Sequence, residues 1–218
     1  MILDFGDGFF LRQATAADRA ALAMICLKTG DAGKDATDRE DDPDLLGLVY
    51  TIPYQVFEPD LAFVVDGPTG VSGYLLGAAD TNSFNARLAT DWYPELQASV
   101  TDPGPDSTRW QGSDWARHRI HHPDLSVRQA LVAYPSHGHI DLLPQARGKG
   151  IGRQAMAFLE QRLAASGSTG LCLEVMRRNI DALNFYRAVG FEVLQDVQPP
   201  KDCVYVAKRL ASAQDVAG

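Results

Sequence analysis

One twelve-residue segment combines glycines and cations in a pattern suited to holding a phosphate group. Its sequence is Leu142-Leu143-Pro144-Gln145-Ala146-Arg147-Gly148-Lys149-Gly150-Ile151-Gly152-Arg153. Glycines at alternate positions permit a tight turn and leave backbone N–H groups unobstructed by side chains. We expect an apolar strand to end at Pro144 and a helix to begin near Gly150. The N–H groups would then converge at a helix N-terminus, where the helix dipole favours an anion by about 0.3–1 kcal/mol.

The spacing of this segment differs from the two best-known phosphate loops. No GK[ST] follows, which excludes a Walker A loop, and no carboxylate is placed to hold magnesium. The pattern R-x-x-G-x-G also lacks the acidic residue that a dinucleotide site carries about 20 residues further on. The segment therefore suits a pyrophosphate held by backbone and basic side chains. The alternative is a tight strand-to-helix turn whose basic residues are incidental.

A second motif lies about thirty residues downstream, after a predicted strand of its own. Its sequence is Asn179-Ile180-Asp181-Ala182-Leu183-Asn184-Phe185-Tyr186-Arg187-Ala188-Val189-Gly190-Phe191. Together, R-x-x-G-x-G and N-x-x-A-x-x-F-Y-x-x-x-G-F resemble the two signature motifs of the GNAT acetyltransferases. The resemblance implies that acetyl-CoA is the cosubstrate, with its pyrophosphate on the first motif and its pantetheine arm along residues 140–143. It also implies that Asn179 lies near the pantetheine and that Tyr186 protonates the departing thiolate.

The resemblance thus implies a set of residues that bind acetyl-CoA without a metal ion. These are Leu142, Leu143, Arg147, Gly148, Lys149, Gly150, Ile151, Gly152, Arg153, Asn179 and Tyr186. For Tyr186 there is an alternative, a core aromatic residue on an amphipathic helix.

A closer resemblance covers nearly the whole chain. It rests on four segments: Ile25-Cys26-Leu27-Lys28-Thr29-Gly30-Asp31-Ala32-Gly33, Asp42-Pro43-Asp44-Leu45-Leu46-Gly47, Gly73-Tyr74-Leu75-Leu76-Gly77 and Tyr134-Pro135-Ser136. These are similar to the acetyltransferase-like C-terminal domain of eukaryotic O-GlcNAcase, and more so to its free-standing bacterial relatives. The animal domain is regarded as a pseudo-acetyltransferase that has lost the phosphate-loop glycines. This chain keeps Gly148, Gly150 and Gly152, so acetyl-CoA binding is expected.

Acetyl transfer to an amine also requires a group that removes a proton. A lysine-like amine is about one part in a thousand neutral at pH 7.4, a penalty of roughly 4 kcal/mol. The predicted strand before the phosphate loop places His137, His139 and Asp141 on one face. His139 and Asp141 are our candidates for the catalytic base. The alternative for them is a half-buried structural hydrogen-bond pair.

Two observations keep the identity of the base open. Other GNAT enzymes tend to place the base in register with residues 134, 136 or 138, on the opposite face of the strand. Asp31 and Glu58, in loops on the predicted acceptor side, are further candidates.

The elements that must position these residues form an α/β pattern. We expect strands at 9–13, 61–65, 71–78, 137–143, 171–176, 191–194 and 204–208, and helices at 16–28, 43–50, 151–163 and 182–189. This order predicts a GNAT fold, a mixed central sheet with helices on both faces, as a single domain over residues 1–210. Residues 80–135, which carry all three tryptophans, are expected to be an irregular insertion that walls the acceptor pocket; the alternative is a long loop that its aromatic residues anchor to the core. Residues 211–218 are expected to be a frayed tail.

Composition limits the functions that the chain can have. The 218 residues carry a formal net charge of −8, which argues against nucleic-acid binding. No apolar run is long enough to span a membrane, and Met1 to Asp7 lacks a basic leader, so no membrane association and a cytoplasmic location are expected. The three cysteines are far apart, which argues against a metal cluster and favours a reducing compartment.

The sequence therefore predicts an enzyme, an acetyl-CoA-dependent N-acetyltransferase, which could form a homodimer. Its acceptor could be a protein lysine, a small amine, an aminoglycoside or an N-terminus. The alternative is a pseudo-acetyltransferase that binds acetyl-CoA or a peptide partner without turnover.

Overall fold

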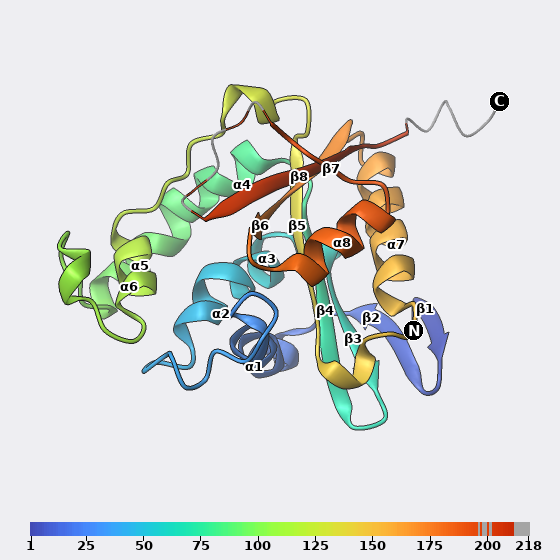
Figure 1. Cartoon of the computed structure of the whole chain (residues 1–218), viewed down its shortest axis with the longest axis horizontal. Helices are drawn as coiled ribbons and strands as arrows, with labels where there is room; N and C mark the ends of the chain where they lie inside the picture. Colours follow the sequence, from blue (N-terminus) through green and yellow to red (C-terminus); the bar gives the residue numbers. More distant parts are fainter. Residues whose placement is uncertain (196, 198–199, 201, 212–218) are drawn as a thin grey trace.

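The computed structural model describes residues 1–195, 197, 200 and 202–211, and within them eight strands form one sheet (Figure 1). The strand order is β1-β2-β3-β4-β5-β6-β8-β7. The strands are β1 (Leu3–Gly6), β2 (Phe9–Gln13), β3 (Ala62–Gly67), β4 (Gly70–Ala78), β5 (Ser136–Leu142), β6 (Gly170–Met176), β7 (Glu192–Val193) and β8 (Cys203–Arg209). All neighbours are antiparallel except β5 and β6, which run parallel.

Helices cover both faces of this sheet (Figure 1). They are α1 (Arg19–Thr29), α2 (Leu45–Tyr50), α3 (Ile52–Phe57), α4 (Thr81–Arg87), α5 (Tyr93–Ser99), α6 (Asp114–His121), α7 (Ile151–Ala165) and α8 (Ile180–Ala188). Side chains alternate along β4, so Tyr74 and Leu76 pack in one core cluster with helices α1 to α6, whereas Leu75 packs in a second with α7 and α8. The predicted fold class, a mixed sheet with helices on both faces, is confirmed.

Strands β5 and β6 separate soon after they begin. They pair only at Ser136 with Leu171 and at His137 with Cys172. Beyond these two pairs β5 stays bound to β4 alone, as far as Leu142, and β6 stays bound to β8. A wedge-shaped gap therefore opens in the middle of the sheet. It is widest at the C-terminal ends of β5 and β6, after which α7 and α8 begin.

Most predicted elements lie within one to three residues of their observed bounds. The predicted hairpin at 61–78 is β3 and β4, and the predicted strands at 137–143 and 171–176 are β5 and β6. Strand β1 was not predicted, because a four-residue strand ending in Gly6 gives too short an alternation to recognise. The predicted tail lies outside the described residues apart from Ala211.

The expectation of an irregular insertion at 80–135 is wrong for much of its length. The segment contains α4, a π-helical turn (Leu88–Trp92), α5 and α6. Apolar residues recur every fourth position at Phe84, Leu88, Trp92 and Leu96, and they pack in one core cluster. The helices are short, and prolines and loops lie between them. The four-residue spacing of apolar residues is therefore hard to recognise from the sequence alone.

Candidate functional site

The backbone of β5 presents free hydrogen-bonding groups to the gap beside β6. The N–H of Leu143 donates to the carbonyl of Ser72 on β4 over 2.8 Å. Because backbone groups in a strand alternate between its two edges, Gly138, Ile140 and Leu142 turn theirs towards the gap. The carbonyl of Leu142 is already taken by Arg147 Nε at 2.6 Å. Gly138 and Ile140 therefore supply the groups that an extended ligand in the gap could bind.

The glycine loop lies where β5 ends and α7 begins. Gly148 and Gly150 have φ angles of 73° and 76°, in the left-handed region that side chains disfavour. A Cβ on Gly148 would meet nothing within 4 Å, and one on Gly150 only Gln154 Nε2 at 3.9 Å. The space above the loop is therefore open.

Gly150 is also the N-cap of α7, a 15-residue helix. The N–H groups of its first turn have no partner within the helix and no capping side chain. Ile151 is buried and holds this end of the helix against the core. Open space, unpaired N–H groups and the helix dipole together fit an anionic phosphate group.

The three basic residues of the loop differ in their surroundings. The Arg147 guanidinium donates to Gly33 O at 2.9 Å, and Lys149 pairs with Asp7 at 3.0 Å. Arg153 is exposed, and within the described ranges it has no ion pair. All three lie near the glycine loop, and within the described residues only Lys149 pairs with a carboxylate. The partners of Arg147 are backbone carbonyls, so Arg147 and Arg153 both keep their positive charge for a ligand.

Gly152 lies between α7 and α8 rather than at the open loop. A Cβ there would come within 3.2 Å of the Phe185 ring and 3.8 Å of Leu142 Cδ1. The absence of a side chain allows α8 to approach the start of α7 closely. Of the three glycines in the motif, two therefore leave space for a ligand and the third permits helix packing.

Asn179 caps α8 and borders the loop that follows α1. Its Oδ1 accepts a hydrogen bond from the N–H of Ala182 at 3.1 Å. A Cβ on Gly33 would lie 3.4 Å from its Nδ2. In the same loop, residues 30–34, Asp31 pairs with Arg178 and with Arg39. The loop therefore contacts Arg147 after β5 and Arg178 after β6, and so bridges the two sides of the gap.

Tyr186 is a buried residue of α8, 6% exposed. Its ring packs against Phe185 and Phe191, with centroid distances of 5.2 and 5.6 Å. Burial, together with the negative charge of Asp141 on β5, raises the pKa of the phenol well above its ordinary value. Among the described residues its hydroxyl has no hydrogen bond, and no unpaired side-chain oxygen is sealed from solvent. The hydroxyl is therefore protonated and free to reach a ligand.

A cavity of about 500 Å³ lies on the face of the sheet that α1 to α6 cover, and Arg119 of α6 is among its lining residues. Aromatic rings from α2, α3, α4 and α5 form much of its wall: Tyr50, Tyr54, Phe84 and Tyr93. His139 and Gly138 of β5 and Glu174 of β6 line it where the two strands separate. The cavity therefore meets the gap beside β5.

The two histidines of β5 are kept neutral in this cavity. Burial lowers the pKa of His137 to about 3, and the neighbouring His139 contributes. Burial, with the charge of Arg119, lowers the pKa of His139 to about 4. His137 Nδ1 is 2.9 Å from Thr81 Oγ1, whereas His139 stands between the rings of Tyr50 and Tyr54. Of the two, only His139 makes no hydrogen bond through its ring nitrogens within the described chain.

Asp141 lies on the same face of β5 but does not line the cavity. Its Oδ2 accepts a 2.5 Å hydrogen bond from the Tyr74 hydroxyl. Burial raises the pKa of Asp141 to about 6, although the bonds from Tyr74 and Thr29 oppose the shift. The sequence predicted His139 and Asp141 on one face of the strand as candidate bases, and the structure gives each its own surroundings.

The other two candidate bases also lie outside the cavity lining. Asp31 is engaged by two arginines, as described above. Glu58 caps the end of α3, and burial raises its pKa.

Two charged residues of the cavity wall, Arg119 and Glu174, were missed in the sequence. Arg119 lies on α6, in the segment expected to be irregular, and Glu174 lies in the middle of β6. The alternation along β6 places Glu174 on the same face as Cys172, opposite His137. That signal was present in the sequence, but nothing in the sequence indicated that β5 and β6 separate.

Some features are absent from the part of the chain that the structure describes. No group of three potential ligands there could hold a metal ion. No helix within the same residues has the length and apolar character that crossing a membrane requires. Cys26, Cys172 and Cys203 are free and buried.

Comparison with known proteins identifies relatives of this chain. Residues 129–191, which include the glycine loop and α8, match the model of the Acetyltransferase (GNAT) family. The chain is 26% identical over 203 residues to protein O-GlcNAcase of Rattus norvegicus and of Mus musculus. The match covers 93% of this chain, which spans only about a fifth (22%) of the length of these relatives.

Solved structures resemble the whole chain. The protein described in "Crystal structure of SsHAT" is 31% identical, with a TM-score of 0.84, over 94% of this chain and 100% of that one. A GNAT superfamily phosphinothricin acetyltransferase from Sinorhizobium meliloti, solved in complex with AcCoA, has a TM-score of 0.55 at 16% identity. That match covers 95% of this chain and 91% of the other, and it shows a shared fold.

Proposed function

Because the chain belongs to the acetyltransferase (GNAT) family, we propose that it binds acetyl-CoA and transfers the acetyl group to the nitrogen of an amine. The observation that carries this proposal is the gap between β5 and β6, with the open glycine loop at its end. The loop offers N–H groups to a pyrophosphate, and the edge of β5 offers backbone groups to a pantetheine arm. A chain of this shape, lying along β5, would bring its thioester to the cavity.

The residues around the gap suit direct transfer to a bound amine. A backbone N–H of β5 facing the gap would polarise the thioester carbonyl, as an oxyanion hole does. We assign Tyr186 as the acid that protonates the thiolate when the carbon–sulfur bond breaks. We assign His139, which is neutral and lines the cavity, as the group that accepts the proton of the amine.

Acetyl-CoA binding should fail when the glycine loop is obstructed. We expect Gly150→Val to weaken binding at least tenfold, about 1.4 kcal/mol, because its side chain would occupy the space open to the pyrophosphate. Calorimetric titration with acetyl-CoA measures this directly. Gly167→Val is the matched control, since Gly167 has a φ of 89° and open surroundings at the other end of α7. Equal affinities in the two folded variants would remove the loop from the binding site.

His139 should make a modest contribution to turnover. General-base catalysis contributes about 10²–10⁴ in rate when the base has a pKa near the working pH. Burial lowers the pKa of His139 to about 4, so it is a weak base, and we expect His139→Gln to lower kcat about tenfold. Because the imidazole is neutral throughout, kcat/KM between pH 5.5 and 8 should show no inflection from it. A loss of such an inflection in the variant would contradict this assignment.

The release of CoA decides between turnover and binding alone. Acetyl-CoA that binds tightly but releases no CoA with any amine would favour a pseudo-acetyltransferase.

A further inference from the structure

The cavity carries a positive and a negative side chain that do not pair with each other. Arg119 of α6 lies with its guanidinium carbon 5.4 Å from the centre of the Tyr50 ring. Within the described residues it has no hydrogen bond or ion pair, and no unpaired polar side-chain atom is sealed from solvent. Its nitrogens therefore face the accessible space of the cavity that Arg119 lines. A half-buried guanidinium in this state can accept an anionic partner.

Glu174 carries the negative charge, and it lies where β5 and β6 separate. Its field contributes to the raised pKa of Arg119, after that of Tyr50 and against the effect of burial. The two charges are therefore close enough to interact, although no hydrogen bond joins the side chains. Burial, followed by the nearby carboxylate of Glu174, raises the pKa of the Cys203 thiol, and that carboxylate keeps acceptor positions for a ligand.

The other charged groups of the cavity wall already have partners in the protein. Asp124 pairs with Arg128 at 3.1 Å. Asp80 caps α4, with Oδ1 accepting the N–H of Ser83 at 2.8 Å. The charges available to a ligand are therefore the positive charge of Arg119 and the negative charge of Glu174.

We propose that the acceptor is a small molecule that carries an anionic group besides its amine, such as an α-amino acid. Arg119 binds the anionic group, and Glu174 holds the amine beside the gap where the thioester would lie. This assignment rests on the proposed function and names its substrate class.

The shape of the cavity favours a small molecule over a polypeptide. Residues 124–128 together with 131 and 132, which lead from α6 back to β5, also line it. Tyr205 of β8 lines it too, and the Arg128 guanidinium lies 5.9 Å from the centre of that ring. A volume of about 500 Å³ is within the range of pockets for small ligands. A cavity of this volume fits a small molecule better than an extended chain.

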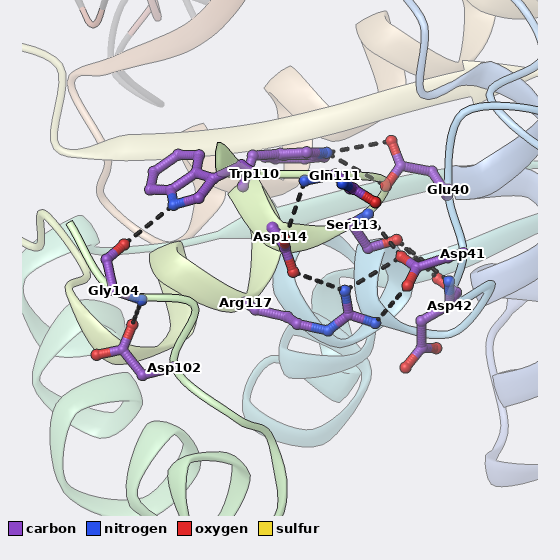
Figure 2. A network of polar contacts seen from close by, with 11 residues as sticks. Glu40, Asp41, Asp42, Asp102, Gly104, Trp110, Gln111, Ser113, Asp114 and Arg117 are labelled. Atoms are coloured by element: carbon purple, nitrogen blue, oxygen red, sulfur yellow. Dashed lines mark hydrogen bonds and ion pairs between the residues drawn. The ribbon is translucent and has the colours of Figure 1, made fainter. Parts of the chain in front are cut away.

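A network of polar contacts fixes the helix that carries Arg119 (Figure 2). The backbone N–H of Ser113 donates to Asp41 at 2.7 Å, and Arg117 donates to both oxygens of Asp41 at 3.1 Å. Trp115 Nε1 donates to Glu40 at 3.1 Å. The start of α6 is therefore tied to residues 40–42, so the position of Arg119 is set before a ligand arrives.

The test compares each of a set of α-amino acids with its carboxamide, in which the carboxylate charge is removed and the amine kept. CoA release is measured for wild type, Arg119→Gln, Arg119→Lys and Arg162→Gln. Wild type should prefer the acid of a pair. Arg119→Gln should raise KM for the acid about 10- to 100-fold, the usual effect of losing a charged hydrogen bond, and leave the carboxamide within a few fold. Arg119→Lys should recover part of the loss.

Arg162→Gln is the control, because Arg162 is an exposed residue of α7 on the other face of the sheet. It should match wild type for both members of each pair. Equal use of acids and carboxamides by wild type, or an unchanged preference in Arg119→Gln, would overturn the assignment. So would activity on peptide lysines alone.

Binding measurements separate this inference from the proposed function. If no amine supports CoA release, the amino acids are titrated by calorimetry into wild type and Arg119→Gln in the presence of acetyl-CoA. Binding that depends on Arg119 would support the site while the transferase proposal fails. Absence of amino-acid binding to wild type would reject the site, whatever the outcome with acetyl-CoA.

Discussion

Replacing Tyr186 with phenylalanine should lower kcat about a hundredfold and leave the affinity for acetyl-CoA within a few fold. The phenol and a departing thiolate have ordinary pKa values of about 10 and 8.5, close enough for a short hydrogen bond to pass the proton. General-acid catalysis is worth about 10²–10⁴ in rate. Burial and Asp141 raise the pKa of Tyr186 further, which keeps it protonated but makes it a weaker acid. We therefore expect an effect near the lower end of that range.

A second substitution separates chemistry from packing at this position. Tyr186→Phe keeps the ring that packs against Phe185 and Phe191, so its melting temperature should remain near that of wild type. Tyr186→Leu removes the ring and should destabilise the protein by a few kcal/mol, in line with other losses of buried aromatic rings. Full turnover in a stable Tyr186→Phe protein would show that water protonates the thiolate. An equal loss of acetyl-CoA binding would make Tyr186 a packing residue.

The local parts of this site could be predicted from the sequence because each depends on residues close together in the chain. Alternating glycines before a helix specify a loop that needs positive φ angles, and Gly148 and Gly150 have them. Asn179 precedes a helical pattern and caps α8. Within the aromatic pair of α8, Tyr186 is buried and Phe185 only partly buried, a difference that the spacing of the two residues does not reveal.

The acceptor side could not be predicted, because it depends on contacts between distant segments. Arg119 reaches the cavity only because residues 40–42 hold α6 in place, more than 70 positions away in the chain. Glu174 faces the cavity only because β6 leaves β5 after two pairs. No local pattern of hydrophobic or turn residues in the sequence indicates either arrangement. The length and the tryptophans of 80–135 led to the expectation of an irregular segment, and its helices were not predicted.

Acid should destabilise the folded protein through the two histidines of β5. Their folded-state pKa values are lowered to about 3 and about 4 by burial, whereas an unfolded histidine titrates near 6.5. Below pH 6.5 the unfolded chain therefore binds more protons, and stability falls as the pH falls. Asp141 opposes this, because burial raises its folded-state pKa to about 6 and the folded protein takes up a proton there first. Two histidines against one carboxyl leave a net loss of about 2 kcal/mol between pH 7 and 5.

Two variants should change this pH dependence in opposite directions. His139→Gln removes one of the two opposed histidines, so the loss between pH 7 and 5 should shrink to about 1 kcal/mol or less. Asp141→Asn removes the compensating carboxyl, so the loss should grow to between about 3 and 4 kcal/mol. Urea unfolding at several pH values measures both. The substituted side chains carry no charge between pH 7 and 5. A lost contact therefore lowers the free energy of unfolding equally at every pH, whereas the loss of a titrating group changes its slope against pH. Parallel curves for all three proteins would mean that His139 and Asp141 titrate alike in the folded and unfolded chain.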